Sequence, residues 1–457
     1  MHLLVEWIGV FGFGVLSALS ENKNIRHQIA QNIKKLYKQQ NQHPTHGNKQ
    51  TSNENRVINQ INEKLTKNKA MISKTDKGSS VIVSYQEEYK DKINKFIASN
   101  NFTIANSDVT KKLQRDIRNT VNECQQIIHK SDRWKYVNLN PTAPTIRGLV
   151  KVHKEGTTIG PIVSSLNCRQ ERCTHTSPYL TRLTWKTAQL MNDVTDLPYD
   201  RNIKFASHDI NNMYSNVPIE EMITILGKLC EINSIEDKTK QDILKITQVI
   251  VEQNYFRFQD MIYVQNEGLM IGAPAFSIFS EIYLQNLENT KITKLLLKHE
   301  VEGYFIYIND ILILYKEDQT NIHNVLDYFN SVTPNMKFTL EKEENNKINF
   351  LDITIAKGHD SLLFEIYRKP TTTDVIIPND SCHPSEHKTA AIGYSYNRMK
   401  SYKLTPESQQ KERNMIQQIL VNNNYEASTL NTISEEKKQN ETLKKENGRS
   451  SHISGRK

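Results

Sequence analysis

Cysteine and long apolar runs are what this sequence has least of. Its five cysteines are scattered over 457 residues without a CxxC pair, which excludes a disulfide framework, gives no sign of zinc and favours a reducing compartment. The long apolar stretch Leu3–Leu19 contains Glu6 and three glycines and has no positive segment before it. It therefore suits neither a membrane span nor a standard signal peptide, and an amphipathic helix or a misplaced start codon explains it better. We expect a nuclear or cytoplasmic protein without stable membrane association.

Size and charge narrow the class of protein further. A chain of 457 residues with 37% hydrophobic content can build two or three domains with a sizeable core. Its 59 Lys and Arg exceed its 51 Asp and Glu, which gives a net charge of +8. An excess of this sign suits a polyanionic partner such as nucleic acid.

The order of predicted elements indicates an α+β fold. Residues 21–70 are rich in Asn, Gln, Lys and His and are typical of a helical or mobile basic extension. The last thirty or so residues alternate Glu, Lys, Asn and Ser, which predicts disorder. Between these ends, apolar periodicity predicts helices over 108–130, 239–252, 275–288 and 385–425 and one after Pro218. It predicts strands over 81–85, 161–165, 204–210, 348–355 and 362–370, and hairpins over 255–264 and 304–315.

The run "YFIYINDILILY", Tyr304–Tyr315, places two polar residues in the middle of an apolar segment. Asn309 and Asp310 are residues that tight turns favour, so a β-hairpin with both residues in its turn accounts for the pattern. A second interpretation is that the same turn presents a carboxylate to a metal ion.

Other residues make the second interpretation more specific. Asp209 ends the strand-like run "IKFASHD", where an unpaired buried acid would be costly without a cation or a hydrogen-bond donor. For Asp209 alone, a capping or turn role is sufficient. Together with Tyr214, the Gly-rich helix entry "GLMIGAP" and Asp310, it could form one groove that holds Mg²⁺ and a triphosphate. Such an arrangement is the palm of a polymerase.

With these residues in place, the chain resembles the reverse transcriptase of Penelope-like retroelements. Six or more blocks occur in the family's order over about residues 70–425. Chance matches are common for one such motif and much rarer for an ordered series. The blocks are "TDKGSSVIV", "GLVKVHK" with "GPIVSS", "HDINNMYSNVPIEE", "GLMIGAPAFSIFSEIYLQNLE", "YIND", "FTLEKEENNKINFLDITI", and "YRKPTTTD" followed by "CHPSEHK".

The resemblance implies a right-hand polymerase that copies an RNA template onto a DNA primer from deoxynucleoside triphosphates. Asp209 and Asp310 would lie on neighbouring strands and share a metal. The implied domains are a partly disordered N-terminal extension (1–70), fingers and the N-terminal part of the polymerase region (71–203), a palm (204–378), a helical thumb (379–425) and a disordered charged tail (426–457).

The family's site residues carry over to matching positions. Asp209, helped by the carbonyl of Ile210, would bind two Mg²⁺ ions, for which Mn²⁺ could substitute, and Asp310 would belong to the third motif's acidic pair. Tyr214 would exclude a ribose 2′-OH. Gly272, Ala273 and Pro274 would let nucleotide and template approach the backbone; Lys151, His153 and Lys154 would contact phosphates, and Lys337 could protonate the leaving pyrophosphate.

Two departures from the family pattern affect the same chemistry. Asn309 stands where the family has the first acid of the third motif; an amide oxygen can coordinate Mg²⁺ but adds no negative charge. Gly160 stands where the family has an arginine that grips the triphosphate. We expect no counterpart of the GIY-YIG nuclease that commonly follows the thumb, because the residues printed after Tyr425 show no strand-like segments. We therefore expect impaired polymerisation.

Two other classes of protein compete with an impaired enzyme. The first is a noncatalytic nucleic-acid-binding remnant of a reverse transcriptase, which would keep the fold and the basic groove but lack the metal centre. The second is a structural or interaction protein whose motifs are coincidental, which does not explain why the blocks come in order.

Overall fold

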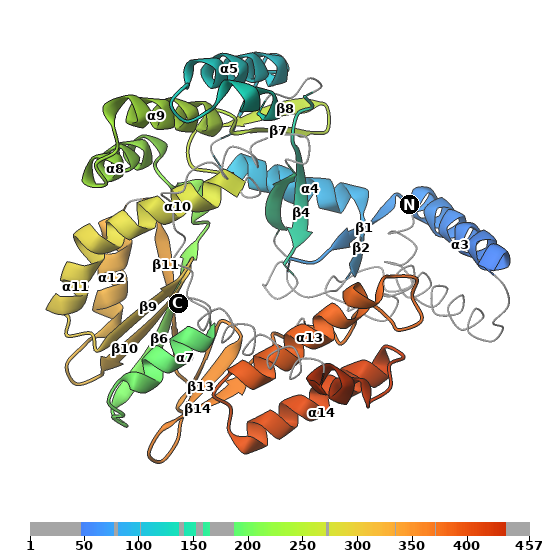
Figure 1. The fold of residues 1–457 in the computed structure, drawn as a ribbon, viewed down its shortest axis with the longest axis vertical. Coiled ribbons are helices and arrows are strands. Elements are labelled where there is room, and N and C mark those ends of the chain that lie inside the picture. The colour runs from blue at the N-terminus through green and yellow to red at the C-terminus, as the bar shows by residue number, and fades with distance from the viewer. Residues whose placement is uncertain are drawn as a thin grey trace, which may run out of the picture.

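The computed structural model describes residues 47–76, 81–100, 102–136, 141–151, 159–164, 187–270, 274–333, 335–370 and 372–435 (Figure 1). The apolar stretch Leu3–Leu19, the polar stretch up to residue 46 and the tail beyond residue 435 lie outside these ranges. No helix in the described ranges is both long and apolar enough to cross a membrane.

A four-stranded sheet with the order β11-β6-β10-β9 forms the centre of the molecule (Figure 1). All three pairs of neighbouring strands are antiparallel. Branched and aromatic apolar residues dominate β6, β9 and β10, which is the composition that a pleated, half-buried surface favours. The strands are β6 (Ile203–Asn211), β9 (Gly303–Tyr307), β10 (Asp310–Lys316) and β11 (Lys337–Lys342).

The two faces of this sheet pack against different elements because successive side chains of a strand point to opposite sides. Ala206 and Ile210 of β6 belong to a large apolar core shared with the helices α8, α10 and α12. Phe205 belongs to a second core, shared with α7 and the strands β12 to β14. These helices are α7 (Thr187–Asp196), α8 (Ile219–Ile232), α10 (Pro274–Leu287) and α12 (Ile322–Val332).

A five-stranded sheet with the order β3-β8-β7-β4-β5 lies beyond α10. Strands β3, β4 and β5 come before the domain boundary expected between residues 203 and 204, whereas β7 and β8 come after it. The sheet therefore spans the expected boundary. Pairing between strands that are distant in the sequence brings these five strands into one sheet. The elements here are α4 (Gln86–Ser99), β3 (Phe102–Ile104), α5 (Thr110–Glu123), η1 (Lys130–Lys135), β4 (Thr145–Val150), β5 (Ile159–Ser164), α9 (Asp237–Val251), β7 (Tyr255–Phe258) and β8 (Met261–Gln265).

The first described elements bring a distant motif to this second sheet. The helix α3 (Gly47–Lys67) precedes a hairpin of β1 (Ala70–Lys74) and β2 (Val81–Tyr85). Thr75 then forms a bridge with Val150, and the backbone N–H of Asp76 donates to the carbonyl oxygen of Val150 at 3.1 Å. The segment that begins "TDKG" therefore starts beside the end of β4.

A three-stranded sheet follows the central one and corrects an expected strand. Residues 348–355 form a hairpin and not one strand, because Leu351 adopts a φ of 53° and reverses the chain. Nothing in a leucine signals a left-handed conformation. The strands are β12 (Lys347–Phe350), β13 (Ile353–Lys357) and β14 (Leu362–Ile366), in the order β12-β13-β14.

The described chain ends with α13 (Ser385–Ser401), α14 (Pro406–Asn422) and a helical segment at residues 429–435, which pack around one apolar core. Leu430 and Ile433 are buried in this core. The expected disorder from residue 426 is therefore wrong for residues 426–435, where two apolar side chains three positions apart complete the core. The short helices η3 (Tyr214–Asn216), η4 (Glu288–Ile292) and α11 (Thr293–Lys298) complete the fold.

Candidate active site

Asp209 and Asp310 lie directly opposite each other on β6 and β10. The backbone N–H of Ile210 donates to the carbonyl oxygen of Asn309 at 3.0 Å. Because hydrogen-bonded and non-hydrogen-bonded pairs alternate in an antiparallel ladder, Asp209 and Asp310 form the non-hydrogen-bonded kind, in which side chains come closest. Two like charges in such a pair repel each other. A cation or a hydrogen-bond donor between them offsets this repulsion.

The turn before Asp310 is one residue earlier than expected. Asp310 is the first residue of β10 and is paired with Tyr307, so the turn consists of Ile308 and Asn309. Ile308 has a φ of 58°, which is unfavourable for a β-branched residue. Strain of this kind costs about 1–3 kcal/mol and persists only where surrounding structure enforces it. Here the strained turn sits beside the two aspartates.

Asn309 turns its amide nitrogen toward Asp209. Its Nδ2 donates to Oδ1 of Asp209 at 2.7 Å. The sequence led us to expect the amide oxygen of Asn309 at a metal; in the structure a donor N–H occupies that side of the Asp209 carboxylate. An acid at position 309 could not make this contact without a proton. The amide thus supplies to Asp209 part of the stabilisation that a cation would supply.

Few of the described side chains near Asp209 and Asp310 could act as ligands for two divalent metal ions. Within the described ranges, no group of three His, Cys, Asp or Glu side chains could hold a metal. Magnesium in nucleotide-handling proteins is commonly bound by one or two carboxylates together with substrate phosphates. Asp209 and Asp310 fit one ion in this manner. A second ion would have to share the same two carboxylates, one of which already accepts the Asn309 amide.

The neighbouring strand β11 places Thr339 and Lys337 beside Asp209. Thr339 is opposite Asp209 and donates its hydroxyl to the backbone oxygen of Asp209 at 3.3 Å. Lys337 is opposite Asn211, two residues along β6, and is exposed. Alternate residues of a strand share a face, so Lys337 is on the face that carries both aspartates.

On the other face of β6, His208 is buried and uncharged. Its Nδ1 donates to the carbonyl oxygen of Thr339 at 3.0 Å, and its ring stacks on Phe329 with centroids 5.5 Å apart. Burial lowers the pKa of His208 to about 4, although the Thr339 contact opposes this shift. The His208 imidazole therefore stays neutral at physiological pH and adds no positive charge behind the two aspartates.

Tyr214 is held next to the loop that leads into α10. The N–H of Leu269 donates to the carbonyl oxygen of Tyr214 at 2.7 Å. Gly268, with a φ of 72°, lies so close to Ser215 that an added Cβ would be 1.9 Å from its carbonyl oxygen. The buried amide of Asn254 donates to the carbonyl oxygen of Gly268 at 2.7 Å. These contacts hold Tyr214 against the "GLM" segment. Of the other residues predicted here, Gly272 and Ala273 lie outside the described residues, and Pro274 begins α10.

Gly160, Lys151 and Asp76 meet at the ends of β4 and β5. Gly160 is opposite Leu149, and a Cβ added to Gly160 would lie 2.9 Å from Cε of Lys151 and 3.1 Å from Oδ1 of Asp76. The side chain of Lys151 thus fills the space beside the glycine. The sequence predicted no role for Asp76, which lies in the "TDKG" block. His153 and Lys154 lie outside the described residues.

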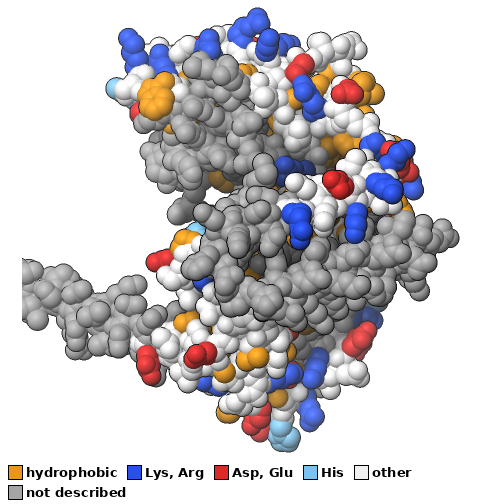
Figure 2. Space-filling view, turned by 90° about the vertical axis from the view of Figure 1, so that its right-hand side faces the viewer, with side chains coloured by type: hydrophobic (Ala, Val, Ile, Leu, Met, Phe, Trp, Pro, Cys, Tyr) orange, Lys and Arg blue, Asp and Glu red, His pale blue; other side chains and the backbone are white. Residues whose placement is uncertain are grey.

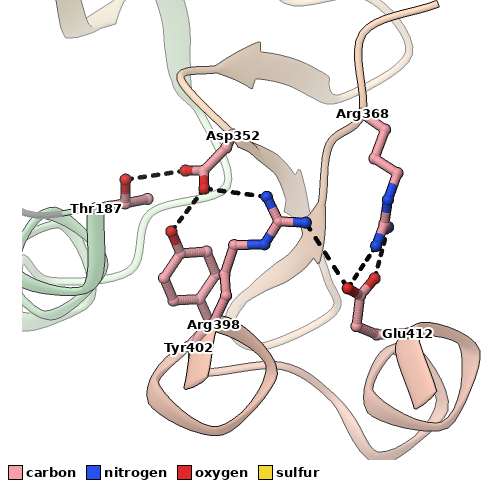
Figure 3. Close-up of polar contacts among 6 residues, drawn as sticks. All are labelled: Thr187, Asp352, Arg368, Arg398, Tyr402 and Glu412. Carbon is pink, nitrogen blue, oxygen red and sulfur yellow. Dashed lines mark hydrogen bonds and ion pairs between the residues drawn. The ribbon is translucent and has the colours of Figure 1, made fainter. Parts of the chain in front are cut away.

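Two further motif residues without an assigned role hold the C-terminal helices in place (Figure 3). Asp352, in the "FLD" block, accepts hydrogen bonds from the hydroxyls of Tyr402 at 2.7 Å and Thr187 at 2.9 Å and lies 3.4 Å from Nη1 of Arg398. Arg368, in the "YRK" block, donates two hydrogen bonds to Glu412, at 2.6 and 2.5 Å. The "FLD" and "YRK" blocks therefore contribute Asp352 and Arg368 to one polar network, which Arg398 and Glu412 connect.

The chain is similar to known proteins in one C-terminal segment of its sequence and in its overall fold. The family model of the animal helix-turn-helix domain matches residues 375–435. A search of curated proteins finds no match. Among solved structures, the telomerase of Candida albicans in complex with a TWJ fragment of telomeric RNA has a TM-score of 0.54 at 11% identity, over 91% of this chain and 76% of that one.

Two other solved structures resemble the chain less. The apo telomerase of Candida tropicalis has a TM-score of 0.45 at 11% identity and covers 94% of this chain and 78% of its own. The Sicinivirus 3Dpol RNA-dependent RNA polymerase has a TM-score of 0.38 at 12% identity, over 70% of this chain and 69% of its own. At such identities a likeness concerns the fold alone, and the first structure carries it.

Proposed function

We propose that this chain, which has a nucleic-acid polymerase fold, is the reverse transcriptase of a Penelope-like retroelement whose nucleotide addition is impaired. The observation that carries the proposal is the facing pair of Asp209 and Asp310, with the Asn309 amide bound to Asp209 at 2.7 Å. Two acids in the closest kind of cross-strand pair are costly for stability. Their position is explained by a cation-dependent reaction at this edge of the sheet.

In this proposal the central sheet and its helices form the palm, the five-stranded sheet belongs to the fingers, and the C-terminal helices are the thumb. Asp209 and Asp310, with the carbonyl of Ile210, would hold Mg²⁺ or Mn²⁺. When bound, such ions lower the barrier by neutralising charge on the attacking and leaving oxygens of phosphoryl transfer. The substrates would be an RNA template, a DNA primer and deoxynucleoside triphosphates.

The remaining site residues would position these substrates. Tyr214, fixed through its carbonyl oxygen, would lie under the incoming sugar and exclude a 2′-OH. Lys337, on the face of the two aspartates, could protonate the leaving pyrophosphate. The other proposed contacts to nucleotide and template are Gly272, Ala273, Pro274, Lys151 and Lys154.

The expected impairment of nucleotide addition follows from the number of carboxylates at the proposed metal site. With an aspartate at position 309 the site would offer three carboxylates; with Asn309 it offers two, and one of them accepts the amide N–H. Metal ions supply several kcal/mol of transition-state stabilisation in such reactions. Each loss of about 1.4 kcal/mol slows the reaction roughly tenfold. We therefore expect little or no primer extension by this sequence.

The alternative is a noncatalytic nucleic-acid binder on the same fold. The Asn309 contact favours it, because an amide that stabilises Asp209 directly makes the strained turn independent of a metal ion. Binding to a primer-template needs positive charge and base stacking, and neither depends on the two aspartates.

Nucleotide incorporation on an RNA template, with Mg²⁺ and then Mn²⁺, separates these possibilities. The test compares the natural chain, Asn309→Asp, Gly160→Arg and the double variant, with Asp209→Ala in the double background as the blank. We expect Asn309→Asp to raise extension roughly a hundredfold, because it restores a charged ligand. Gly160→Arg should add less, since the new guanidinium would displace Lys151 and pair with Asp76.

Two outcomes would contradict the proposal. Robust extension by the natural chain would mean that two carboxylates suffice and that there is no impairment. A double variant as inactive as the Asp209→Ala blank would support the noncatalytic binder.

A further inference from the structure

Outside the candidate active site, four exposed cations lie together on α5. Lys111, Arg115 and Arg118 recur at intervals of four and three residues, so they share one face of the helix. All three are exposed, as is Lys112 beside them. Figure 2 shows Lys and Arg side chains gathered along the top of the molecule, where Figure 1 places α5 and α9. We call these four residues the α5 face.

The charges of the α5 face are not used within the described chain. None of the four side chains forms an ion pair with another described residue, whereas the exposed Glu123 at the end of α5 is paired with Lys245 at 3.2 Å. Clustered cations repel each other. Four cations without an ion pair among the described residues make the α5 face suited to binding a polyanion, whose negative charges would neutralise them.

An exposed tryptophan lies next to this face. Trp134 is 66% exposed, on the short helix η1. The end of α5 and η1 pack together around Val121, Ile128 and Tyr136, which fixes η1 against the helix that carries the cations. Large aromatic side chains gain stability from burial. An exposed indole on a rigid support instead offers a flat surface on which a nucleobase can stack.

We propose that the α5 face and Trp134 bind single-stranded nucleic acid, with phosphates on the cations and a base on the indole. Cations together with an aromatic platform are the combination by which proteins hold single strands without reading their sequence. Lys111 and Arg118 are about 10 Å apart along the helix axis, a distance over which a strand carries several phosphates. A duplex has its bases stacked on one another and leaves Trp134 unused.

Under the proposed function this strand is the unpaired part of the RNA template. The inference rests on that function only for the identity of the strand. Binding of single-stranded RNA at α5 can therefore be measured without nucleotide addition, and its failure is distinguishable from failure of the polymerase proposal.

The test uses the full chain and two fluorescent probes, a single-stranded RNA and a blunt RNA/DNA duplex without an overhang. Arg115→Gln with Arg118→Gln is compared with Lys294→Gln and Lys298→Gln, two exposed cations on α11 that lose the same charge. Trp134→Ala is compared with Trp134→Phe, which keeps an aromatic ring.

We expect the arginine double variant to bind the RNA roughly tenfold more weakly and to lower the salt slope by about 1.4, since each phosphate contact on a single strand contributes about 0.7. Trp134→Ala should weaken RNA binding by roughly 5- to 100-fold through lost stacking, with little change in salt slope. Trp134→Phe should bind nearly as the natural chain does. The Trp134 variants should not alter binding of the blunt duplex, and the arginine double variant should weaken duplex binding less than RNA binding.

Several results would overturn the inference. Equal weakening by the α11 control would show a general effect of net charge. Equal weakening for the blunt duplex would show that the face does not select single strands. Unchanged RNA binding in Trp134→Ala would remove the stacking role.

Discussion

At the scale of single residues, Ile308 sets the backbone shape of the turn before β10, and Asn309 sets the charge and hydrogen bonding beside Asp209. Ile308 keeps the unfavourable φ of 58° that the hairpin requires. Asn309 keeps a polar turn residue but donates a hydrogen bond where an acid would accept one or bind a cation. Compared with an aspartate at the same position, Asn309 therefore removes a negative charge beside Asp209 while keeping the strand register that opposes Asp209 and Asp310.

Gly268 is a second residue whose backbone supports the site. We predict that Gly268→Ala lowers the free energy of unfolding by at least about 2 kcal/mol, because its positive φ and the contact with Ser215 leave no space for a Cβ. Chemical denaturation measures the change. Gly227→Ala is the control: it is on α8, and its added Cβ would meet Leu244 at 3.7 Å.

In the control, a helical Gly→Ala change should stabilise the protein by roughly 0.5–1 kcal/mol. Equal effects of the two substitutions would show that the loop between β8 and α10 moves freely away from Ser215, and that Tyr214 is not held as described.

At the scale of elements, the C-terminal helices are held to the rest of the chain by buried ion pairs. Glu412 of α14 is 3% exposed and contacts Arg368, just beyond β14, and Arg398 of α13. Residues 375–435, which match the animal helix-turn-helix domain, contain six Lys and Arg and six Asp and Glu. Such a balance lacks the excess positive charge typical of an independent DNA-binding module. The network instead supports a unit that is fixed against the β12-β13-β14 sheet.

We predict that Glu412→Gln destabilises this unit by about 3–5 kcal/mol, because it leaves two guanidinium groups without their shared carboxylate in a largely buried place. Urea denaturation followed by circular dichroism measures the loss, and limited proteolysis after β14 locates it. Lys411→Gln is the matched control at the next position. Lys411 is 76% exposed and 3.4 Å from Glu365, and exposed pairs contribute at most about 1 kcal/mol. If both variants unfold alike, the network does not hold the helices.

At the scale of the whole molecule, one apolar core joins the central sheet to the five-stranded sheet. Ile210 of β6, Phe256 of β7 and Phe276 of α10 all belong to it. The two sheets therefore form a continuous support for the edge that carries Asp209 and Asp310. Changes at Asp209, Asn309 and Asp310 should leave this support and its surface charge intact.

We predict that the purified protein binds an RNA/DNA primer-template with an affinity that falls steeply with salt. Four phosphate contacts would give a roughly hundredfold loss when salt rises about fourfold. Without divalent ions, Asn309→Asp should leave this affinity nearly unchanged, because it acts only on the proposed metal site. Fluorescence anisotropy at several salt concentrations measures both. Salt-independent or absent binding would instead indicate a protein-interaction role.

The sequence by itself determined most of the helices and strands, including the two strands that carry Asp209 and Asp310. Apolar runs of strand-like composition predicted the strands around Asp209 and Asp310, and the helix entry at Pro274 followed from "GLMIGAP". These features depend on side chains a few positions apart, and periodicity and turn chemistry report such local preferences.

Only the tertiary structure decided which distant groups meet. It moved the turn from Asn309 and Asp310 to Ile308 and Asn309, paired β7 with β4 across the expected domain boundary, and buried Leu430 and Ile433. It also turned the Asn309 amide toward a residue 100 positions earlier. Strand register, left-handed φ values and buried ion pairs are set by partners far along the chain. A local pattern carries no information about those partners, because their free energy depends on the whole packed fold.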